Sequence, residues 1–130
     1  MTTENIPGHS PSVDIDGVQH ALVDQERLAI LVEALGDKKL AELFITARQS
    51  VVESADELKR CWVSGDTRQA GRAAHRLAGV AANFGFSALG TIARNIERDC
   101  LSSGDGKSFA ASFDDILAAS LATTLDMTKK

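Results

Sequence analysis

The chain contains no tyrosine, a single tryptophan and only two prolines among its 130 residues, and it has just two cysteines. Alanine and leucine outnumber the aromatic and β-branched residues that favour strands, so helices are expected. Strand-like alternation and internal repeats are also missing. Cys61 and Cys100 lack the spacing of a zinc site, and we expect reduced thiols in the core of a cytoplasmic protein. These absences predict an all-α fold without a metal site.

An excess of positive charge and a long apolar run are missing as well. The net charge is -4, whereas binding to a nucleic-acid backbone calls for a basic surface. No stretch approaches the roughly 20 apolar residues of a membrane span, and the start of the chain lacks a basic segment followed by an apolar one. We therefore expect neither nucleic acid nor membrane as a partner.

The length is typical of a single domain, in which about two-thirds of the unfolded surface becomes buried. Residues 1–19 are rich in loop-forming residues and are expected to form a flexible arm. The helical pattern occupies residues 20–125, and a polar tail is expected at 126–130.

Apolar residues recur at helical spacing in five segments that are separated by turn signals. The first segment is short, and the second is about 25 residues long, above the ordinary mean. Four long amphipathic helices with short connections favour an up-down-up-down antiparallel four-helix bundle, with the short N-terminal helix as a lid at one end. The five segments are expected to begin at Asp24, after Gly36, at the capping box that starts with Asp66, at Ser87 and after Gly106.

His75 lies in the third predicted helix, on the side opposite its apolar stripe. At about 100° per residue, His75 is about 160° from Leu77, the centre of that stripe. Gly79 lies on the His75 side, and a glycine inside a helix costs about 1 kcal/mol relative to alanine. Close approach of another molecule would justify that cost. The other residues on this side are small or basic: Arg68, Gly71, Arg72 and Ala82.

Several alternative functions lack the residues they need. A di-iron centre is excluded because no Glu-x-x-His pair occurs. A hydrolase with His75 as general base would need a nucleophile and an orienting carboxylate, and Ser64 and Ser87 are explained by helix ends. Without a Gly-rich phosphate loop or a carboxylate cluster for Mg²⁺, neither ATP binding nor autophosphorylation is expected. An idle surface histidine remains an alternative.

The segment His75–Gly85 (HRLAGVAANFG) resembles the signature of histidine-containing phosphotransfer domains. In that family the histidine is followed by an aliphatic residue at plus two, lysine at plus three, and glycines at plus four and plus ten. Leu77, Gly79 and Gly85 match. Glu97 aligns with a family position close to the imidazole, and the likeness covers about residues 24–125.

The resemblance implies a phosphorelay intermediate without kinase activity. His75 would accept a phosphoryl group from the phospho-aspartate of a response-regulator receiver domain and pass it to another receiver domain. A neutral imidazole is nucleophilic near neutral pH and needs no base. The chain needs no cofactor of its own, because the receiver would carry Mg²⁺. A hybrid histidine kinase is a further candidate partner, and we expect a monomer.

One position departs from the family pattern, because the lysine is replaced by Ala78. We expect Arg72, one turn before His75, to supply the missing cation, with Arg76 or Arg68 less well placed. The small residues Gly71, Ala78, Gly79 and Ala82 would let a receiver settle over the imidazole. The alternative is an adaptor that binds a receiver or a kinase without accepting phosphate.

Overall fold

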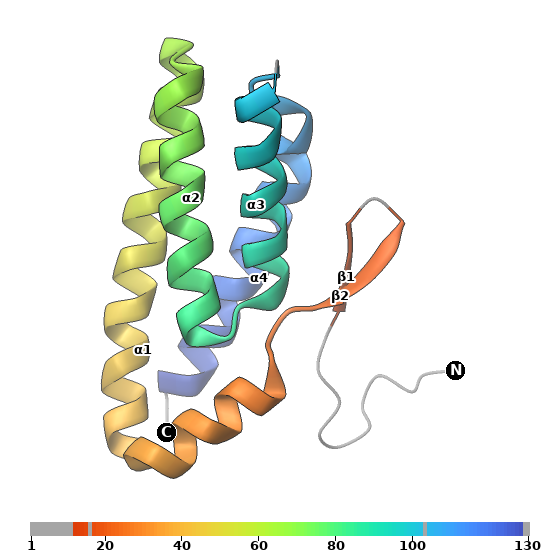
Figure 1. Cartoon of the computed structure of the whole chain (residues 1–130). Helices are drawn as coiled ribbons and strands as arrows, with labels where there is room; N and C mark the ends of the chain where they lie inside the picture. Colours follow the sequence, from red (N-terminus) through yellow and green to blue (C-terminus); the bar gives the residue numbers. More distant parts are fainter. Residues whose placement is uncertain (1–11, 16, 103, 129–130) are drawn as a thin grey trace.

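The computed structural model describes the backbone of residues 12–15, 17–102 and 104–128, with side chains as far as residue 123. This part of the chain is mostly helical, as predicted (Figure 1). In chain order, the elements are β1 (Ser12–Ile15), β2 (Val18–Ala21), α1 (Gln25–Ser64), α2 (Thr67–Phe84), α3 (Ser87–Ser102), the 3-10 turn η1 (Lys107–Phe109) and α4 (Ala110–Thr128).

The long part of α1 and helices α2, α3 and α4 lie side by side, and the chain direction alternates from one to the next (Figure 1). Glycines end α1 and α2: Gly65 and Gly85 both have φ 77°, the left-handed conformation that closes a helix. Asp66 begins α2 by accepting a hydrogen bond from the Gln69 amide at 3.1 Å. Among the described residues, no helix is long and apolar enough to cross a membrane.

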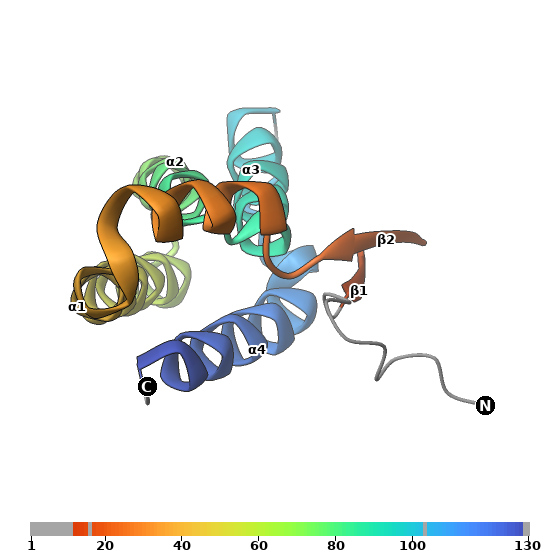
Figure 2. The same cartoon turned by 90° about the horizontal axis from the view of Figure 1, so that it is seen from below.

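Helix α1 extends over 40 residues but is broken at Gly36, where φ is 79° and ψ is 166°. The sequence places a short helix before this glycine, and the structure has a helical segment on each side of the break, with an abrupt change of direction between them. The part before the break crosses the ends of α2 and α3 (Figure 2). Two hydrogen bonds attach it to the end of α2, from the Asp24 amide to the Gly85 carbonyl (2.7 Å) and from Arg27 Nε to the Asn83 carbonyl (3.0 Å).

The expectation of a chain without strands is wrong. Strands β1 and β2 pair in an antiparallel hairpin in which Ile15 faces Val18. That register leaves the two-residue connection Asp16-Gly17, and Asp-Gly is a strong hairpin signal that composition alone overlooks. Ile15 is buried in the core, so residues 12–15 and 17–19 of the segment expected as a flexible arm belong to a hairpin that packs on the bundle. Residues 1–11 of that predicted arm lie outside the described residues.

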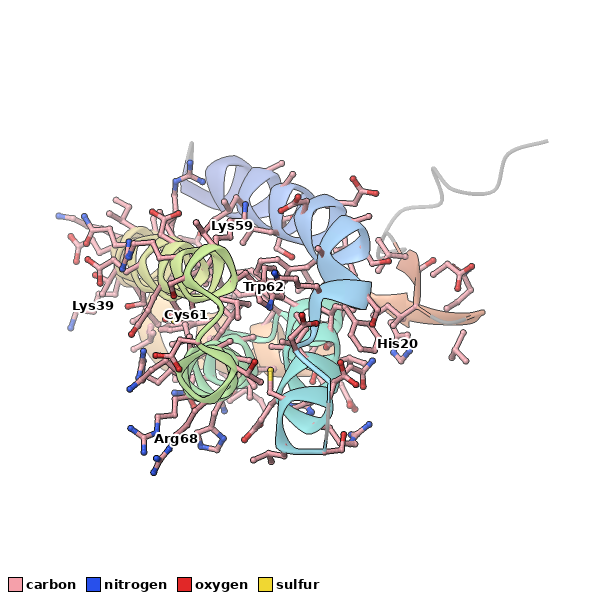
Figure 3. All side chains as sticks on the ribbon, turned by 90° about the horizontal axis from the view of Figure 1, so that it is seen from above. His20, Lys39, Lys59, Cys61, Trp62 and Arg68 are labelled. Carbon is pink, nitrogen blue, oxygen red and sulfur yellow. The ribbon has the colours of Figure 1, made fainter. Side chains whose placement is uncertain are left out.

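The core of the bundle is built from helical faces and a few aromatic rings. The ring of Phe44 contacts those of Phe84 and Phe86, at centroid distances of 6.1 and 5.9 Å. Trp62 points into the bundle (Figure 3). Its indole ring meets Phe113 edge-on at 6.0 Å and its Nε1 donates to the Asp105 carbonyl at 2.8 Å. These contacts fix α4 and the preceding turn against α1.

The expected burial of the two cysteines needs correction. Cys61 and Cys100 are free thiols, but both are only partly buried rather than in the core. Helix α4 continues to Thr128, into the segment expected as a polar tail at 126–130. Residues 129–130 lie outside the part of the chain that the structure describes.

Candidate functional site

The orientation of α2 exposes His75. The residues of its apolar stripe, centred on Leu77, are buried against the other helices. The His75 side chain is 73% exposed and is directed away from that core. The sequence prediction of an exposed histidine is therefore confirmed by the packing of the helix.

Glu97 of α3 holds the imidazole of His75. The distance from His75 Nδ1 to Glu97 Oε2 is 2.9 Å, and the Glu97 side chain is only 25% exposed. Because an ionised carboxylate can only accept, Nδ1 carries the proton and donates it to Glu97. In a neutral imidazole, Nε2 then keeps its lone pair. The arrangement produces a nucleophilic nitrogen on the exposed side of the ring.

A groove of about 790 Å³ lies beside His75, between α2 and α3. Arg68 and Arg72 line it from α2, and Figure 3 shows Arg68 extending outward from the bundle. Among the described residues, neither arginine forms an ion pair. The groove therefore has an unneutralised positive wall next to the imidazole. Its other lining residues are Thr67, Gly71, Arg76, Glu97, Cys100 and Leu101.

A second groove, of about 420 Å³, lies on the other side of α2, against α1. Arg76 lines both grooves, and its guanidinium forms an ion pair with Glu57 of α1. The remaining lining of the second groove is small or acidic apart from one aliphatic residue: Ser50, Glu53, Ser54, Gly79 and Val80. Sequence reasoning missed Glu57, because no local pattern relates two residues on different helices.

The small residues on α2 have different roles. Gly79 is exposed, and a Cβ built on it would meet nothing within 4 Å, so another molecule can approach the backbone there. Ala82 is exposed as well. Gly71 and Ala78 are buried, although we expected both on the docking face. A Cβ on Gly71 would lie 3.2 Å from Cys100 Cβ, because α3 covers this part of α2.

Cys100 borders the groove from α3. Burial raises the pKa of its thiol, and the negative charges of Asp99, Asp105 and Glu97 raise it further. Such a thiol is a poor nucleophile near neutral pH. Among the described residues, no group of three or more His, Cys, Asp or Glu side chains could hold a metal ion.

Comparison with known proteins matches the chain to a family model. The family model of the Hpt domain matches residues 24–127, which include α1 to α3, all but the last residue of α4, His75 and Glu97 but exclude the hairpin. No curated protein and no solved structure matches the chain. Hpt domains have a phosphotransfer role in two-component signalling and act as phosphocarriers rather than as kinases. Because the match spans most of its length, the chain belongs to the histidine-containing phosphotransfer (Hpt) domain family.

Proposed function

We propose that His75 is the phosphoryl acceptor of a phosphorelay intermediate, which takes the group from the phospho-aspartate of one receiver domain and passes it to another. The observation that carries this proposal is the 2.9 Å contact between His75 Nδ1 and Glu97. It leaves Nε2 free on an exposed ring. A surface histidine without function would not need a partly buried carboxylate to orient it.

The transfer step follows from this geometry. The Nε2 lone pair forms the bond to phosphorus while the bond from phosphorus to the aspartyl oxygen breaks, and its electron pair stays on the aspartate carboxylate. The Nδ1 proton remains in place, so the phosphorylated ring is cationic. Glu97 then stabilises that cation. The reverse step returns the group to the aspartate of a second receiver.

The positive wall of the groove supplies charge for the phosphoryl group. Arg72 is one helical turn before His75 and, like Arg68, forms no ion pair among the described residues. In the family, a lysine stands at the position of Ala78. We assign the role of that lysine to Arg72. Because Ala78 is buried, a lysine at this position would have to extend along the surface to reach the phosphoryl group.

The partners in this proposal are response-regulator receiver domains, one of which could belong to a hybrid histidine kinase. The receiver brings Mg²⁺, and the chain acts in the cytoplasm as a monomer with no cofactor of its own. The exposed backbone around Gly79 and Ala82 accommodates the edge of the receiver's active site.

The test is phosphotransfer from a phosphorylated receiver domain of the same cell. Wild type should gain a label that is stable to alkali and labile to acid, and His75→Gln should gain none. His20→Gln, on strand β2, is the matched histidine control and should be labelled like wild type. Binding of receivers without any label would refute the proposal and establish the adaptor function. Turnover of activated esters by the wild type would instead indicate a hydrolase.

The choice of cation has its own test. Arg72→Ala should slow the transfer to His75, and Ala78→Lys should accelerate it or rescue the Arg72 variant. Unchanged rates in both variants would show that Arg72 does not compensate for the missing lysine.

A further inference from the structure

Arg76 occupies an unusual position next to the acceptor. It follows His75 directly in α2 and lines both the groove with the free arginines and the acidic groove against α1. Its guanidinium is paired with Glu57, and the two side chains are 49% and 38% exposed. The ion pair therefore lies in partial contact with water, where it can open without burying a charge.

Phosphorylation of His75 would change the charge that Arg76 meets. A phosphoryl group adds a charge of about -1.5 to -2 near pH 7 and three strong acceptor oxygens. Arginine binds such a group in a bidentate manner with charge-assisted hydrogen bonds. An exposed pair of single charges is weak by comparison. The family's lysine is absent at Ala78, so the phosphoryl group depends on the arginines of α2 for positive charge.

We propose that Arg76 is a switch residue, paired with Glu57 while His75 is unmodified and transferred to the phosphoryl group once Nε2 carries it. This inference rests on the proposed function of His75. The exchange leaves the Glu57 carboxylate free beside Glu53 in the α1–α2 groove. The two forms of the protein then present different charges to a receiver, with the phosphorylated form more acidic on its α1 side.

The switch can be tested without an identified partner by loading His75 from potassium phosphoramidate. The Nε2 lone pair forms the bond to phosphorus as the P–N bond of N-protonated phosphoramidate breaks, and ammonia leaves with the electron pair. The ³¹P signal of the phosphohistidine is then followed against pH. The charged groups around it are Arg68, Arg72 and Arg76 on α2, Glu97 on α3 and Glu57 on α1.

The variants are Glu57→Gln, Arg76→Gln and the double substitution. Asp114→Asn is the matched control, because it breaks a similarly exposed ion pair with Lys59 on the α4 side of α1 (Figure 3). A nearby guanidinium favours the phosphoryl dianion. Glu57→Gln releases Arg76 and should therefore lower the proton affinity of the phosphoryl group about two- to fivefold. Arg76→Gln should raise this proton affinity, and Asp114→Asn should leave it unchanged.

The double substitution separates the switch from a simple loss of charge at position 57. If Arg76 moves, the effect of Glu57→Gln is larger with Arg76 present than in the Arg76→Gln background. Equal effects in both backgrounds, or no effect of Arg76→Gln, would overturn the switch alone. Failure of both phosphoramidate and phosphorylated receivers to load wild-type His75 would overturn the proposed function, and the switch with it.

Discussion

Substitutions at Gly79 should separate effects on stability from effects on phosphotransfer. It lies within α2, is exposed and has open space where a Cβ would be. Alanine at this position gains helix propensity and meets no neighbour. We expect Gly79→Ala to raise the free energy of unfolding by about 1 kcal/mol, which corresponds to about 4 °C in Tm. Urea unfolding followed by circular dichroism measures the change.

Gly71 provides the matched comparison within the same helix. The same substitution there also gains helix propensity, but the new Cβ would be 3.2 Å from Cys100 Cβ. Since α3 must shift to relieve this contact, Gly71→Ala should show no gain in stability and should fall below Gly79→Ala. Similar gains at both positions would show that open space does not distinguish these two glycines.

A larger side chain at Gly79 should affect function instead. Leucine fits the helix and projects from the surface one turn beyond His75. The fold should therefore remain stable, while phosphotransfer from a receiver should slow by about tenfold to a hundredfold, because a displaced donor no longer aligns with Nε2. A Gly79→Leu protein that accepts label at the wild-type rate would refute the assignment of Gly79 to the docking face.

Three further predictions concern packing, capping and the thiol. Phe113→Ala removes a fully buried ring that meets Trp62 and should cost about 3–5 kcal/mol in urea unfolding; a loss below about 1 kcal/mol would contradict this packing. Asp66→Ala deletes the cap on the Gln69 amide and should cost about 1 kcal/mol in the same assay, whereas an unchanged midpoint would show that the cap is dispensable. Alkylation of Cys100 in a Cys61→Ala background should reach half its maximal rate at a higher pH in the folded protein than in urea, because burial raises the thiol pKa. A lower midpoint pH in the folded protein than in urea would contradict the raised pKa of the Cys100 thiol.

The ends of the elements were predictable because they depend on local chemistry. Gly36, Gly65 and Gly85 all take positive φ, and the sequence marks each as a helix end. Asp66 caps α2 as its capping-box pattern indicates. The exposed side of α2, and His75 on it, followed from periodicity alone. Each of these features involves residues within about one or two helical turns of one another.

Features that depend on another helix were not predictable in this way. A helical wheel places Gly71 on the exposed side of α2, but the wheel takes no account of α3, which buries it. The ion pair between Arg76 and Glu57 joins residues 19 positions apart on two helices. The hairpin was missed for a different reason. Its Asp16-Gly17 signal is local, but the many loop-forming residues of the segment favoured a flexible arm.

The orientation of His75 depends on the packing of α3 over Gly71. Gly71 lies one turn before His75, and Cys100 lies about one turn after Glu97, so the two contacts are neighbouring steps along the α2–α3 interface. The absence of a side chain at Gly71 permits the close approach of the two helices there. That approach brings the Glu97 carboxylate within 2.9 Å of Nδ1. The glycine therefore acts on the nucleophile through helix spacing, and the orientation of His75 is a property of two packed helices rather than of the signature in α2.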